Sequence, residues 1–257
     1  MKVLFSICAL LLCFIFTPKN ALAQESDHLI LINLSTNQLS FFEHGKYIRT
    51  FPIASGKKAT PTPEGMFCVI NKYKNKKYHI KNIEGGTSNN PLGTRWMGLN
   101  KAGYAIHGTN REGSIGSYAS NGCIRMHDKH IQWLYDRVPL QTKVIITHFY
   151  GSIEKTAHRL GYRVISWRGM DVGNDQIGEL RIIKPTALYW QEPNGQLTSI
   201  RTLLPNEKYA VVSHNGQGMY YIGNRLYIKD TEQTAIRYEQ IPNYIIVNQY
   251  KRKLKSP

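Results

Sequence analysis

The chain has 257 residues, with 33 Lys and Arg against 17 Asp and Glu. Its length suits one large domain or two small ones. The basic residues are spread along the chain, which excludes a dedicated basic arm and indicates a general bias toward anionic surfaces.

The first 23 residues have the three-part pattern of a secretory signal peptide. Lys2 precedes an apolar run from Val3 to Phe16, and Ala21-Leu22-Ala23 resembles a cleavage site. The run is shorter than the roughly 20 residues that span a bilayer. We therefore expect cleavage after Ala23, no stable membrane span after processing, and a secreted, extracytoplasmic protein of the cell wall or periplasm.

Cleavage would remove two lysines and no acid, leaving 31 basic against 17 acidic residues, a net charge of +14. Nucleic acid is an unsuitable partner outside the cytoplasm. Anionic cell-wall polymers are the partners that this charge favours.

The next segment has the pattern of a β-meander. Strands are predicted over 29–34, 39–43 and 46–55, separated by the polar turns 35–38 and His44-Gly45. Thr60-Pro61-Thr62-Pro63-Glu64-Gly65 is incompatible with a helix or a central strand, and a strand is predicted after it over 66–71. Residues 72–81 interleave lysines with tyrosines and are predicted to form a solvated hairpin on the rim of a cleft.

Residues 28–150 are predicted to form one mainly β domain. After a polar loop over 85–95, short strands are expected over 96–99 and 104–107, so that His107 stands at a strand end. Ile131, Leu134, Tyr135 and Val138 have the spacing of one amphipathic helix. A last strand is predicted over 144–147.

His107 and Cys123 are the candidate catalytic pair. They lie on either side of a Gly- and Ser-rich loop, and a histidine beside a cysteine can act as the base for a thiol nucleophile. The other cysteine of the mature chain, Cys68, falls in a strand pattern; a buried thiol there is favoured over a disulfide with Cys123. His127-Asp128-x-His130 matches no zinc signature, so no metal site is predicted.

The rest of the chain is predicted to contain a mixed or linker segment over 151–179, with a short helix over 152–160. A small β-barrel follows over 180–230, where short strands recur at short spacing. Its aromatic and aliphatic positions resemble bacterial SH3-like domains of secreted wall proteins. Residues 231–257 are expected to be a basic C-terminal tail.

Four motifs stand in order between residues 60 and 126: Thr60-Pro61-Thr62-Pro63-x-Gly65, Pro91-Leu92-Gly93, His107-Gly108-Thr109 and Ser120-Asn121-Gly122-Cys123-Ile124-Arg125-Met126. Together they resemble the catalytic domain of the L,D-transpeptidases of bacterial peptidoglycan. The resemblance implies a β-sandwich with one short helix after the nucleophile. Many members carry His where this chain has Asn121, which leaves His107 as the base.

The resemblance also implies the reaction and its residues. Cys123 attacks a peptidoglycan stem tetrapeptide, the terminal D-Ala leaves, and an acceptor amine resolves the thioester. His107 is the base, and the Gly108 carbonyl orients its ring. The N–H groups of Gly122 and Cys123 are expected to be oxyanion donors. Ser120, Asn121 and Arg125 are expected to contact substrate, with Arg125 either binding a carboxylate or bracing the loop. No cofactor is implied.

Three alternatives stay open at this stage. Water in place of the amine would give an L,D-carboxypeptidase. A decayed catalytic domain would leave a catalytically weak wall-binding or scaffolding protein. A papain-like protease is disfavoured, because here the histidine precedes the cysteine.

Overall fold

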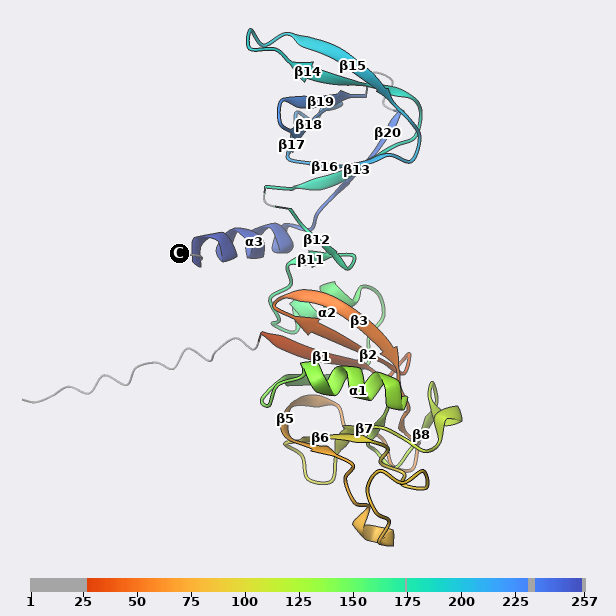
Figure 1. Ribbon diagram of the computed structural model, residues 1–257. Coiled ribbons are helices and arrows are strands. Elements are labelled where there is room, and N and C mark those ends of the chain that lie inside the picture. Colours follow the sequence, from red (N-terminus) through yellow and green to blue (C-terminus); the bar gives the residue numbers. More distant parts are fainter. Residues whose placement is uncertain (1–26, 174, 231–233, 256–257) are drawn as a thin grey trace, which may run out of the picture.

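The computed structural model describes residues 27–173, 175–230 and 234–255. The predicted signal peptide lies outside these residues. Figure 1 shows a lower β unit, a middle layer that contains α2, β11, β12 and α3, and an upper β unit. The prediction of a mainly β protein with a helix after Cys123 is confirmed.

The lower unit is built on an eight-stranded sheet that curls on itself. Its strand order is β3-β2-β1-β10-β5-β6-β7-β9, and an isolated bridge between Ala54 and Arg125 joins the chain after β3 to β9. The strands are β1 (His28–Asn33), β2 (Gln38–Glu43), β3 (Lys46–Pro52), β5 (Gly65–Lys74), β6 (Arg95–Leu99), β7 (Ala105–His107), β9 (Ile124–Arg125) and β10 (Lys143–Thr147). A separate short pair joins β4 (Ser55–Gly56) to β8 (Tyr118–Ser120).

Strand β1 is apolar without alternation because both of its faces are buried. Ile30 and Ile32 point into one core, which α1 (Asp128–Arg137) also fills through Ile131 and Leu134. Leu29 and Leu31 point to the opposite face, against α2 (Ile153–Arg159) and the residues after it. A strand that is buried on both faces has a continuous apolar run. The segment after residue 150 therefore covers the outer face of the lower sheet.

A buried carboxylate organises the middle layer. Glu154 on α2 is 8% exposed and accepts hydrogen bonds from Ser166 Oγ (2.7 Å) and from the N–H groups of Arg168 (2.7 Å) and Gly169 (3.3 Å). These donors belong to the hairpin of β11 (Ser166–Trp167) and β12 (Met170–Asp171). Sequence reasoning predicted the helix but treated residues 168–178 as a linker or loop. No local sequence pattern indicates that these residues donate hydrogen bonds to Glu154.

The upper unit is a small β structure around one core. A three-stranded sheet has the order β16-β13-β20, and a five-stranded sheet has the order β15-β14-β19-β18-β17. Leu180, Leu188 and Ile228 are among the buried residues that the two sheets share. The strands are β13 (Gly178–Ile182), β14 (Thr186–Gln191), β15 (Leu197–Leu203), β16 (Lys208–Val211), β17 (Ser213–His214), β18 (Met219–Gly223), β19 (Leu226–Lys229) and β20 (Ile236–Gln240). The SH3-like resemblance stays a prediction.

Within the segment expected to be a basic tail, the described residues 234–255 form a strand and a helix. Its strand β20 pairs with β13, and helix α3 (Asn243–Lys255) returns to the middle layer. Ile245 is buried there with Trp167 and Val172, and Gln249 Nε2 donates to the carbonyls of Ile165 (3.1 Å) and Val172 (2.9 Å). Sequence reasoning missed this apolar contact because the lysines and arginine near the chain end made the segment look like a basic tail.

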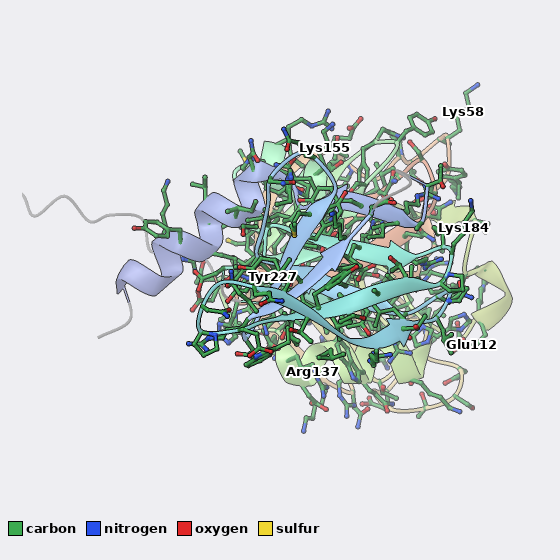
Figure 2. The ribbon with its side chains drawn as sticks, turned by 90° about the horizontal axis from the view of Figure 1, so that it is seen from above. Lys58, Glu112, Arg137, Lys155, Lys184 and Tyr227 are labelled. Carbon is green, nitrogen blue, oxygen red and sulfur yellow. The ribbon has the colours of Figure 1, made fainter. Side chains whose placement is uncertain are left out.

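Charged side chains are distributed around the molecule. Figure 2 looks down on the upper unit and shows Lys58 and Arg137 at opposite edges of the view. In the part of the chain that the structure describes, no helix is long and apolar enough to cross a membrane.

We expect Glu154→Ala to lower the free energy of unfolding by about 1–3 kcal/mol, because three donors lose a buried acceptor. Glu154→Gln, which keeps one carbonyl oxygen, should lose less. Urea unfolding measures both. As a control, Glu192→Ala at the β14–β15 turn should change the value by less than about 0.5 kcal/mol; equal effects of the two alanine variants would contradict the role given to Glu154.

Candidate active site

The register of two short strands brings His107 and Cys123 to one face of the sheet. β7 and β9 are parallel, with Ile106 opposite Ile124 and His107 opposite Arg125. Continued by one residue, this register sets Cys123 opposite Ala105. Side chains of opposed residues, and of residues two apart on one strand, share a face. The predicted nucleophile and base are therefore diagonal neighbours on adjacent strands.

Two contacts fix the ring of His107, which is 4% exposed. Its Nδ1 lies 2.6 Å from the carbonyl oxygen of Gly108. Because a carbonyl only accepts, Nδ1 carries the proton and the Nε2 lone pair is left to act as a base. Trp96, opposite His107 on β6, stacks on the ring at 5.5 Å between centroids.

Burial favours the neutral forms of both side chains. It lowers the pKa of His107 from 6.5 to about 4, with the charge of Arg125 acting in the same direction and backbone hydrogen bonds with Gly108 and Leu92 acting in the opposite one. Burial also raises the pKa of the Cys123 thiol, with the Ala105 backbone and the charge of Arg125 opposing that shift. The thiol lies 3.4 Å from the carbonyl oxygen of Gly103, to which it donates. Near neutral pH the Cys123 thiol and the His107 imidazole are therefore both neutral.

Ser120 has a different place from the one expected. It is completely buried, donates through Oγ to the Cys123 carbonyl (2.6 Å) and accepts from the Gly122 N–H (3.0 Å). A buried hydroxyl with both bonds inside the loop braces that loop and has no surface to offer a substrate. The Gly122 N–H, expected to be an oxyanion donor, is engaged by the same hydroxyl. Asn121 is exposed beside Cys123.

Thr62, in the Thr-Pro segment, supports the loop 120–123 that ends at Cys123. Thr62 Oγ1 donates to the Gly122 carbonyl (2.9 Å) and accepts from the Gly56 N–H (2.8 Å). Gly122 has a φ of +113°, and a Cβ there would lie 2.8 Å from a ring carbon of Tyr104. The position therefore requires glycine for both its backbone angle and its space. Thr62 is a supporting residue whose role the motif alone did not reveal.

Close backbone packing explains a second pair of motif glycines. A Cβ on Gly93 would lie 2.6 Å from the Thr109 nitrogen, and a Cβ on Gly108 would lie 2.1 Å from Asp128 Oδ1. Asp128, at the start of α1, accepts from the Thr94 N–H at 3.1 Å. The loop that carries Pro91-Leu92-Gly93 is thus held against the strand end that presents His107.

Arg125 lies among charged and aromatic groups that come from distant parts of the sequence. Burial lowers its pKa, and the neighbouring guanidinium of Arg111 lowers it further, while Cys123 and Tyr78 act in the opposite direction. Arg125 thus interacts with both the Cys123 thiol and the Arg111 guanidinium, and two neighbouring guanidiniums suit a carboxylate. Sequence reasoning missed Arg111 and Tyr78, since no local pattern links them to Arg125.

A possible metal-ligand cluster lies elsewhere in the lower unit. Among the described residues, His28, Glu43 and His44 bring one ligand atom each within 4.8 Å of one another. They stand on β1, on β2 and at the turn after β2. His127 pairs instead with Glu112. Cys68 is half-buried on β5 and, like Cys123, is a free thiol.

Comparisons with known proteins agree on the lower unit. The family described as YkuD, L,D-transpeptidase catalytic domain, matches residues 27–146. The putative L,D-transpeptidase YqjB of Bacillus subtilis is 43% identical over 136 residues, covering 51% of this chain and 77% of that protein. The chain belongs to the L,D-transpeptidase family. Its membership rests on the lower unit, since the matched region ends before α2.

Other members are more distant. The putative L,D-transpeptidase YkuD of Bacillus subtilis is 39% identical over 117 residues, covering 46% of this chain and 64% of that protein. The solved structure of an Enterococcus faecium L,D-transpeptidase has 26% identity and a TM-score of 0.40, covering 47% of this chain and 50% of that chain.

The buried His107 should make stability depend on pH. Its folded pKa of about 4 lies below its usual 6.5, so between these values the unfolded chain binds more protons than the folded one. Stability is full above pH 6.5 and should fall by roughly 3 kcal/mol as the pH drops toward 4. Urea unfolding across this range measures the loss.

The matched variant is His107→Asn, whose side-chain amide keeps a donor for the Gly108 carbonyl but does not titrate. This variant should lack the part of the stability loss that comes from protonation of His107. The difference between the two proteins separates that part from the effects of acid on other groups. Parallel curves for both proteins from pH 7.5 to 4.5 would contradict the assignment.

Proposed function

We propose that the chain is an L,D-transpeptidase that acts on peptidoglycan stem tetrapeptides through a thioester on Cys123. It releases the terminal D-Ala and transfers the acyl group to an acceptor amine. The observation that carries the proposal is the β7–β9 register, which sets Cys123 and His107 on one face. The contact of His107 Nδ1 with the Gly108 carbonyl leaves Nε2 as the base.

In the acylation step, Cys123 Sγ attacks the carbonyl carbon of the dibasic residue, whose reacting centre has the L-configuration. The S–C bond forms and the C–N bond to D-Ala breaks. His107 Nε2 takes the thiol proton and returns it to the leaving amine. Family membership and the paired geometry support these roles.

The pKa shifts favour proton transfer during attack over a preformed ion pair. A thiolate beside an imidazolium would need a low thiol pKa and a high imidazole pKa, and burial shifts both the other way. Transfer from thiol to imidazole would therefore accompany formation of the S–C bond. The low pKa of His107 also helps it release the proton to the departing amine.

The backbone and the two arginines have supporting roles. The Cys123 N–H is the oxyanion donor that we propose, worth about 3 kcal/mol in comparable acyl-transfer sites. The Gly122 N–H could assist only after leaving Ser120 Oγ. Arg125, with Arg111 beside it, is proposed to bind a substrate carboxylate.

The thioester can be resolved by the amine of a second stem peptide, which gives a cross-link, or by water, which gives carboxypeptidase activity. The reaction would take place outside the cytoplasm, following the signal peptide predicted over residues 1–23. The net positive charge of the mature chain would favour an anionic wall.

Replacing the nucleophile should abolish the reaction. We expect Cys123→Ala to release no D-Ala from a tetrapeptide and to form no covalent adduct with a carbapenem-type acylating agent. Intact mass spectrometry of the mature protein, together with muropeptide analysis, measures both. The cross-linked and hydrolysed products are separated in the same muropeptide assay.

The chain supplies its own control in Cys68. Cys68→Ala should keep the adduct and D-Ala release within about twofold, because this thiol is on β5 and outside the proposed site. Wild-type protein that forms an adduct but turns over no tetrapeptide would favour the wall-binding alternative. Turnover by Cys123→Ala would overturn the nucleophile assignment.

The rate of acylation should report the resting protonation state. With neutral imidazole required and a His107 pKa of about 4, kcat/KM for D-Ala release should be nearly constant from pH 7 to 5 and fall tenfold per pH unit well below 4. Stopped-flow or mass-based rates measure this acid limb. An acid limb centred near 6.5 would contradict the neutral pair.

A further inference from the structure

Three cations stand side by side across the three-stranded sheet of the upper unit. In its registers Arg181 on β13 is directly opposite Lys208 on β16 and also opposite Arg237 on β20. Neighbouring strands are about 4.8 Å apart, so opposed side chains are in mutual contact range. Like charges placed directly opposite one another destabilise a sheet. The repulsion within the row is offset only where the neighbouring acids Glu179 and Glu239, which are opposite each other two residues along, pair with its members.

The row forms one wall of a groove of about 250 Å³. Arg168 from the β11–β12 turn and the acids Glu179 and Glu239 complete the lining, giving four cations and two anions, a net charge of +2. Figure 1 shows β13 and β16 on the side of the upper unit that faces β11 and β12. The groove thus lies where the upper unit meets the middle layer.

The two acids satisfy only part of this positive charge. Glu239 pairs with Arg168 at 2.5 Å and weakly with Arg237 at 4.0 Å, and Glu179 pairs with Lys208 at 3.1 Å. Within the described part of the chain, the guanidinium of Arg181, at the centre of the row, makes no ion pair. It is exposed to solvent between two other cations.

Arg168 is held in the groove at a conformational cost. Its φ is +54°, a left-handed angle that glycine or asparagine adopts more readily. The buried carboxylate of Glu154 accepts its N–H at 2.7 Å and holds that turn in place. A strained arginine and a row of opposed cations, both locally unfavourable, meet in the same groove. Strained residues of this kind cluster at ligand-binding sites.

We propose that this groove binds a ligand with two neighbouring phosphate groups. Three guanidiniums offer planar pairs of donors that match phosphate oxygens. Two strand spacings give the row a width of roughly 10 Å, room for two adjacent phosphates, and their charge complements the net +2. Free diphosphates and phosphodiester polymers of the envelope share this chemistry. The groove is separate from the Cys123 site and does not depend on the proposed transpeptidase reaction.

The test is calorimetric titration of the mature protein with inorganic pyrophosphate, inorganic phosphate and a polyglycerol phosphate, all at 0.15 M salt. We expect pyrophosphate and the polymer to bind, and phosphate to bind at least tenfold more weakly. Arg181→Gln and Arg237→Gln should each weaken binding by tenfold or more. Arg225→Gln, which removes an arginine from the β18–β19 turn of the same unit, should change it less than twofold.

Thermal unfolding separates a binding role from a structural one. Arg181→Gln should leave the melting temperature unchanged or raise it, because it removes repulsion while it abolishes binding. A lowered melting temperature with unchanged binding would overturn the proposal. Equal affinity for phosphate and pyrophosphate, no binding of either, or equal losses in Arg225→Gln would also overturn it.

Discussion

The pairing of β7 with β9 is the constraint on which the candidate active site depends. Two ladder positions determine which face Cys123 and His107 share, and a slip of one residue would turn Cys123 to the opposite side of the sheet. Much of the surrounding structure holds this short pairing in place. Thr62 and Ser120 fasten the loop before β9, while the Ala54 bridge pairs with Arg125 on its free edge. The four sequence motifs therefore act together to hold the β7–β9 register.

Burial gives the same site its chemical character. A histidine exposed to water would share its protons with solvent near neutral pH, whereas His107 is enclosed by Trp96 and the Gly108 carbonyl and stays neutral. The pKa of the Cys123 thiol is shifted in the opposite direction, upward. A thiol is a weaker nucleophile than a thiolate, so the raised pKa lowers the intrinsic reactivity of Cys123 near neutral pH. Stability and reactivity are thus linked through one desolvated ring.

The sequence predicted what local patterns determine. The apolar run of β1 and the spacing of Ile131 and Leu134 have physical causes that lie within a few residues, and the predicted strand and helix were confirmed. The hydrogen bonds of Ser120 and Gly122 were not foreseen: the Ser120 hydroxyl binds inside the loop and engages the Gly122 N–H, while their roles toward substrate and oxyanion stay predictions. Arg111, Tyr78 and Glu154 depend on partners far away in the chain, which no local pattern specifies.

Helix α3 has a consequence for the mobility of the upper unit. Because the chain enters that unit from β12 and returns through β20 to α3, which packs on Trp167 and Val172, the unit is anchored to the middle layer at both of its ends. A domain on one connection can swivel freely, but one on two nearby connections has restricted rotation. The two connections therefore restrict how far the cationic groove can turn relative to the lower unit that carries Cys123.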